Sequence, residues 1–135
     1  MDACELERQI RLDAVMNAVT WGVFARNDLP PGALPPGAYV VNSHDAPGQH
    51  WFLIFVGAQV ELYDSLGKSA SHYGINVPCI TLRKRLQSYN SNSCGQYILY
   101  FLYWRSRGID MDSLFNSLEQ DSESTVQQHY LQHST

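Results

Sequence analysis

A polar stretch that runs directly into an apolar one, at residues 87–104, constrains this chain more than any other feature. Five of the seven residues before Cys94 are serine or asparagine, which disfavour both helix and strand. From Gln96 to Trp104 the residues are almost wholly apolar or aromatic, which is typical of a buried helix. The pattern predicts a loop that leads into a buried helix over 96–105, with Cys94 at the junction.

The position of Cys94 is one at which a thiol can become reactive. A cysteine at a helix start lies beside unpaired backbone N–H groups and the positive end of the helix dipole, and both stabilise the thiolate. They can lower a thiol pKa of about 8.5 by one to several units. Cys94 is therefore a candidate nucleophile, and the alternative is a small buried side chain at a helix start.

The composition predicts one soluble intracellular domain, residues 1–135. An apolar fraction of 44% is sufficient for a core, and the net charge of −4 lacks the basic excess of a dedicated nucleic-acid-binding protein. Cys4, Cys79 and Cys94 lack metal-site spacing and are odd in number, so we expect neither structural zinc nor a disulfide framework. No apolar run reaches the roughly 20 residues that cross a bilayer, and no signal-peptide pattern is present.

Hydrophobic periodicity predicts both helices and strands along the chain. Residues 27–37 contain four prolines and should be irregular, forming either a connector or a wall of a substrate groove. Turns are expected over 43–48 and 65–76. Helices are expected over 2–17, 96–105, 111–118 and 124–131, and strands over 38–42, 51–56, 60–64 and 77–82.

The loop between the second and third of these strands decides which side chains share a face. A three-residue loop at 57–59 places His50 and Asp64 on the same face as diagonal neighbours, within reach of a hydrogen bond. A two-residue loop would place them on opposite faces and leave Glu61 as the nearest alternative acid.

The polar residues of the chain include the set that hydrolysis by a thiol nucleophile needs. That chemistry uses a thiolate, an imidazole, a group that orients the imidazole, and a donor for the oxyanion. In chain order the sequence offers His50, Asp64, Gln87 and Cys94. Taken singly, a histidine beside an apolar strand is commonly structural, and an aspartate after one is commonly a turn residue.

These residues and their spacing resemble adenain, the adenovirus cysteine endopeptidase, and the wider clan that includes the ubiquitin-like-protein proteases. The histidine precedes the cysteine in the chain, unlike the order in papain-like enzymes. The matching segments are His50-Trp51, Tyr63-Asp64-Ser65-Leu66-Gly67, Cys79-Ile80-Thr81-Leu82, and Gln87 followed by Asn92-Ser93-Cys94-Gly95.

The resemblance implies an α+β fold, in which a central mixed or antiparallel sheet carries the histidine and the acid, is flanked by helices, and faces a buried helix with the cysteine at its N-terminus. It implies a thiol protease that hydrolyses capsid and core precursor proteins during virion maturation, in the host nucleus or cytoplasm and in the virion. Cys94 would be the nucleophile, His50 the base and later the acid, Asp64 the orienting acid and Gln87 the oxyanion donor. Trp51 would wall the substrate site, and the chemistry would require no metal or other cofactor.

Two departures from adenain keep other functions open. Adenovirus enzymes usually carry glutamate where this chain has Asp64, whereas the ubiquitin-like-protein proteases carry aspartate. A deubiquitinase-like or SUMO-protease-like enzyme acting on host conjugates is therefore an alternative, and a non-catalytic peptide-binding descendant is another.

The second departure is that this chain is shorter than adenain and acidic. Adenain is basic, and it is stimulated by DNA and by a peptide that is disulfide-linked to a cysteine in a Cys-Ile-Thr-Leu segment. The resemblance thus implies that Cys79 docks an activating peptide, and the alternative is a buried strand cysteine. DNA is a candidate activator by the same resemblance, and the net charge of −4 argues against DNA binding. The basic cluster at 83–85 is either an ordinary solvated surface or a contact for phosphate or an acidic partner.

Overall fold

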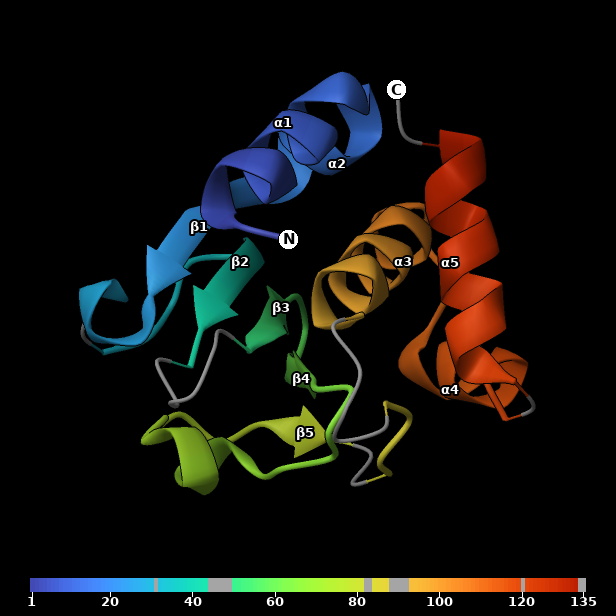
Figure 1. Cartoon of the computed structure of the whole chain (residues 1–135). Helices are drawn as coiled ribbons and strands as arrows, with labels where there is room; N and C mark the ends of the chain where they lie inside the picture. The colour runs from blue at the N-terminus through green and yellow to red at the C-terminus, as the bar shows by residue number, and fades with distance from the viewer. Residues whose placement is uncertain (31, 44–49, 82–83, 88–92, 120, 134–135) are drawn as a thin grey trace.

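The computed structural model describes residues 1–30, 32–43, 50–81, 84–87, 93–119 and 121–133. Its centre is a five-stranded mixed sheet in the order β1-β2-β3-β4-β5, with helices beside it (Figure 1). The β1–β2 and β4–β5 pairs are parallel, and the two middle pairs are antiparallel. The predicted α+β class is confirmed. The strands are β1 (Thr20–Ala25), β2 (Gly37–Asn42), β3 (Trp51–Val56), β4 (Val60–Tyr63) and β5 (Ile80–Thr81).

Strand β3 is covered on both faces, as its wholly apolar sequence predicts. Trp51 and Leu53 belong to the core cluster that also contains the apolar residues of the helix Cys94–Ser106. Phe52 and Ile54 point to the opposite face and belong to a second cluster. Full burial of one such side chain stabilises the fold by about 1.5–3 kcal/mol, so β3 anchors both clusters.

The helices surround one buried member, α3, whose apolar residues permit contacts on every side. It packs against β3, against the two N-terminal helices and against α4 and α5, and Figure 1 shows it between the sheet and α5. The helices are α1 (Ala3–Leu12), α2 (Ala14–Val19), α3 (Cys94–Ser106), α4 (Met111–Ser117) and α5 (Ser122–His133).

The prediction of a single helix over 2–17 was wrong, because the chain breaks at Asp13. Asp13 is extended, and its carboxylate accepts a hydrogen bond from the backbone N–H of Met16 at 2.8 Å. An aspartate at this position caps a new helix instead of continuing the old one. The break allows α2 to turn towards β1.

Two strand predictions were too long. Strand β4 ends at Tyr63, so Asp64 is the first residue beyond it. The strand predicted over 77–82 is reduced to Ile80–Thr81 within the described residues, since Pro78 has no backbone N–H to donate. Residues 44–48 of the predicted turn at 43–48 lie outside the described residues. The turn-rich segment 65–76 contains one 3₁₀ helix, η2 (Ala70–Tyr73). A second, η1 (Arg26–Asp28), overlaps the start of the segment 27–37 that was predicted to be irregular, and β2 begins at its last residue.

Within the described ranges, no helix is long and apolar enough to cross a membrane.

The turn after β4 packs closely against the segment that leads towards α3. Gly67 has a φ of +72°, and a Cβ built on it would lie 2.7 Å from the carbonyl carbon of Lys84. Gly74 has nearly the same φ, +71°, but a Cβ there would meet nothing within 4 Å. Substitution of the two glycines therefore separates the free-energy cost of the left-handed backbone conformation from the cost of the contact with Lys84.

We predict that Gly67→Ala lowers the free energy of unfolding by about 2–5 kcal/mol, because a strained backbone is added to a clash with fixed backbone atoms. Gly74→Ala should cost only about 1–2 kcal/mol, since it carries the conformational strain alone. Urea unfolding of both variants measures the difference. Equal losses would show that the contact of Gly67 with Lys84 does not constrain the turn.

Candidate active site

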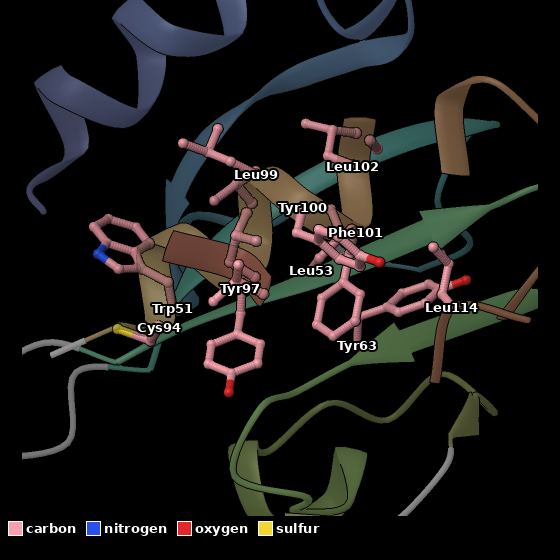
Figure 2. Packing of buried hydrophobic residues seen from close by; sticks show 14 of the residues in the cluster. Trp51, Leu53, Tyr63, Cys94, Tyr97, Leu99, Tyr100, Phe101, Leu102 and Leu114 are labelled. Atoms are coloured by element: carbon pink, nitrogen blue, oxygen red, sulfur yellow. The ribbon is translucent and has the colours of Figure 1, made fainter. Parts of the chain in front are cut away.

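Cys94 is the first residue of α3 and is buried at the margin of the main core cluster, beside Trp51 (Figure 2). Burial alone would raise the pKa of the thiol. Hydrogen bonds with the His50 ring and with the backbone N–H groups of Trp51 and Gly95 outweigh burial, and the pKa of Cys94 lies below its ordinary value. His50, together with these two backbone N–H groups, thus favours the thiolate.

His50 lies immediately before β3 and links Cys94 to a carboxylate. Its Nε2 lies 2.5 Å from Oδ1 of Asp64, so the other ring nitrogen, Nδ1, is the one available to the Cys94 thiol. Burial alone would lower the pKa of His50. The hydrogen bonds and charges of Asp64 and Cys94 outweigh it and raise the pKa to about 9. At neutral pH this geometry favours an imidazolium beside a thiolate.

The strand register that brings His50 to Asp64 is the one predicted from the three-residue loop. Val56 pairs with Val60, and Leu53 pairs with Tyr63. The alternative acid, Glu61, is engaged elsewhere, because its Oε1 accepts hydrogen bonds from Arg105 at 2.9 Å and from the Tyr63 hydroxyl at 2.8 Å.

Four hydrogen bonds from described residues hold Asp64, which is only 1% exposed. Besides His50, the backbone N–H groups of Leu66 and Lys68 donate to it at 3.2 and 2.9 Å, and the Tyr73 hydroxyl donates at 2.6 Å. Burial alone would raise the pKa of Asp64, but these donors and the nearby His50 hold it below the ordinary value. The carboxylate is therefore charged and fixed in one orientation.

Tyr73 is a site residue that sequence reasoning missed. It is buried, its ring stacks on Phe52 at a centroid distance of 4.4 Å, and its hydroxyl reaches Asp64 Oδ2. Tyr73 follows Asp64 by nine residues in a turn-rich segment without periodicity. No pattern in the sequence marks it as a partner of the carboxylate.

Gln87 is buried, and its described hydrogen bonds join it to Ser65. The Ser65 hydroxyl donates to Gln87 Oε1 at 2.5 Å, and the Gln87 backbone N–H donates to the Ser65 carbonyl at 2.9 Å. Residues 88–92, which separate Gln87 from Ser93, lie outside the described part of the chain. The predicted role of Gln87 at the oxyanion therefore stays a prediction.

Trp51 is 2% exposed within the main core cluster, and Met1 packs against that cluster. The indole N–H donates to the Met1 carbonyl at 3.0 Å. A Cβ built on Gly95 would lie 2.9 Å from the Met1 Cβ, so Met1 also covers the residue next to the nucleophile. Sequence reasoning missed this contact, because nothing in the sequence links Met1 to a residue 50 positions away.

Cys79 lies before β5 and not within a strand, which corrects its predicted position. It is half-buried, its thiol donates to the Val77 carbonyl at 3.2 Å, and burial raises its pKa. Of the basic cluster at 83–85, Lys84 and Arg85 are exposed, and Arg83 lies outside the described residues.

Among the residues that the structure describes, no group of three or more His, Cys, Asp or Glu side chains could hold a metal ion.

In comparisons with known proteins, no protein-family model matches this chain and no curated protein matches it.

We predict that iodoacetamide alkylates Cys94 at pH 6 at least about 10-fold faster than Cys79, because alkylation requires the thiolate and the two pKa values shift in opposite directions. Asp64→Asn removes a charge that raises the His50 pKa. The His50 pKa should therefore fall from about 9, so the Cys94 thiolate loses its cationic partner at a lower pH. As a result, the Cys94 pKa should rise. The pH of half-maximal alkylation, followed by mass spectrometry, should therefore move upwards.

Asp110→Asn is the matched control, since Asp110 caps α4 and is exposed. An unchanged alkylation profile in Asp64→Asn would contradict the electrostatic account of the site.

Proposed function

We propose that this chain is a cysteine endopeptidase in which Cys94, His50 and Asp64 act as nucleophile, acid–base and orienting acid. The observation that carries the proposal is the position of the His50 ring, bonded to the buried Asp64 carboxylate on one side and to Cys94 on the other. The raised pKa of His50 and the lowered pKa of Cys94 support it, because thiol proteases react through such an ion pair.

The proposed reaction divides peptide hydrolysis into two steps. The Cys94 thiolate attacks the peptide carbonyl carbon, and His50 gives its proton to the departing amine, leaving a thioester on Cys94. His50, now neutral, removes a proton from water, which attacks the thioester and releases the carboxylic acid. The thiolate leaves, and the proton on His50 restores the ion pair. Asp64 keeps the ring in one orientation throughout.

Each addition step places negative charge on the former carbonyl oxygen. We assign its stabilisation to the backbone N–H of Cys94 and the side-chain N–H₂ of Gln87. Loss of one such donor typically lowers the rate by 10²–10³-fold, so these groups would supply a large share of the catalysis.

The substrate class follows from the resemblance to adenain, which supports cleavage of capsid and core precursor proteins during virion maturation. One feature of the chain favours a second substrate class. The acid is Asp64, in a Tyr-Asp-Ser-Leu-Gly segment, as in the ubiquitin-like-protein proteases. Conjugates of a ubiquitin-like protein are therefore the alternative substrate.

Activation by a docked peptide is proposed at Cys79. Its thiol is half-buried beside β5, the last strand in the sheet order, and an edge strand can accept an added segment. The raised pKa of Cys79 favours a thiol that is slow to oxidise unless a partner approaches.

We predict that Cys94→Ala lowers kcat/KM about 10⁴-fold or more for any peptide that the wild-type protein cleaves, with little loss of stability. A quenched-fluorescent peptide library, read for wild type and variant, measures the effect. Cys4→Ala is the control, because Cys4 is exposed on α1. Retained hydrolysis in Cys94→Ala would refute the proposed nucleophile.

Coumarin derivatives of ubiquitin and SUMO, assayed beside the library, test the substrate class. Hydrolysis of these derivatives without hydrolysis of the peptides would favour the conjugate-cleaving alternative. No hydrolysis of either by wild-type protein, with or without added peptide, would contradict the endopeptidase proposal.

A further inference from the structure

Among the described residues, Ser65 joins the acid side of the proposed site to Gln87 by two hydrogen bonds and to Leu86 by a third. Its carbonyl accepts from the backbone N–H groups of Leu86 and Gln87 at 2.7 and 2.9 Å, and its hydroxyl donates to Gln87 Oε1. Ser65 and Gln87 are 1% and 3% exposed. Since Ser65 directly follows Asp64, these two adjacent residues contact both the His50 imidazole and the Gln87 amide.

The hydroxyl contact distinguishes the two ends of the Gln87 side chain. The distance from Ser65 Oγ to Gln87 Oε1 is 2.5 Å. This lies at the short end of the 2.5–3.0 Å range of O–H···O bonds and below the 2.7–3.2 Å range of N–H···O bonds. The short distance favours the amide oxygen, and not the nitrogen, at Ser65. The amide nitrogen is therefore the end turned away from Ser65.

The orientation of this amide matters for the proposed reaction. An amide nitrogen directed at the developing oxyanion donates a hydrogen bond, whereas an amide oxygen in the same place repels the negative charge. Two backbone hydrogen bonds fix where Gln87 lies, but they do not determine which end of its side chain points where.

We propose that Ser65 is a positioning residue that sets the amide orientation of Gln87 and thereby keeps the oxyanion donor in place. The inference rests on the proposed function. Without the hydroxyl the amide oxygen loses this hydrogen bond and the amide is less firmly oriented, so part of the stabilisation of the oxyanion is lost. Because Ser65 acts through Gln87, it should have no effect once the Gln87 amide is absent.

The test compares Ser65→Ala, Gln87→Ala and the double variant on the best-cleaved library peptide. Ser65→Ala should lower kcat about 10–100-fold with KM little changed. It should weaken inhibition by the matching peptide aldehyde by the same factor, because the aldehyde forms a tetrahedral adduct on Cys94. The double variant should be no slower than Gln87→Ala, and Ser65→Thr, which keeps the hydroxyl, should recover most of the activity.

Two readouts separate positioning from a general structural effect. The alkylation rate of Cys94 by iodoacetamide should be unchanged in Ser65→Ala, because that reaction creates no oxyanion. Ser71→Ala removes an exposed serine from the same turn-rich segment and should leave kcat unchanged.

Two outcomes would overturn the inference in distinguishable ways. Independent, multiplying effects of Ser65→Ala and Gln87→Ala, or unchanged aldehyde inhibition in Ser65→Ala, would refute the role of Ser65 and leave the protease proposal intact. A wild-type protein that is alkylated at Cys94 but neither hydrolyses a peptide or conjugate nor binds an aldehyde would refute both.

Discussion

The buried carboxylate of Asp64 is the constraint on which the rest of the candidate site depends. An isolated charge at this depth would cost many kcal/mol, so it must be matched by donors or by a positive group. Here two backbone N–H groups, the Tyr73 hydroxyl and the His50 ring satisfy it. Protonated His50 in turn stabilises a thiolate at Cys94, so the charge state of the thiol depends on how the turn after β4 is folded.

That turn connects parts of the molecule that are distant in the sequence. Within four residues, Asp64 reaches the segment before β3, Ser65 holds Gln87, and Gly67 packs on the backbone of Lys84. The apolar strands β3 and β4 fix where the turn begins, because both are held by the two core clusters. The well-packed core thus determines the site geometry through a segment that is itself largely polar.

The parts of this structure that the sequence could predict are those with a repeating or local cause. The apolar run of β3 and the three-residue loop after it were sufficient to predict that His50 and Asp64 share a face. Asp13 was harder, because an aspartate within an amphipathic pattern either continues a helix or caps a new one. Tyr73 and Met1 could not be predicted, since each reaches the site through a tertiary contact that no local pattern encodes.

The contact of Met1 with Trp51 and Gly95 has a practical consequence for recombinant work. A purification tag joined ahead of Met1 would begin beside Gly95, the residue that follows Cys94. Helix α5 ends at His133, whose ring centroid lies 4.5 Å from that of Tyr103, near the end of α3 that is opposite Cys94. A tag placed after α5 would therefore begin away from the thiol.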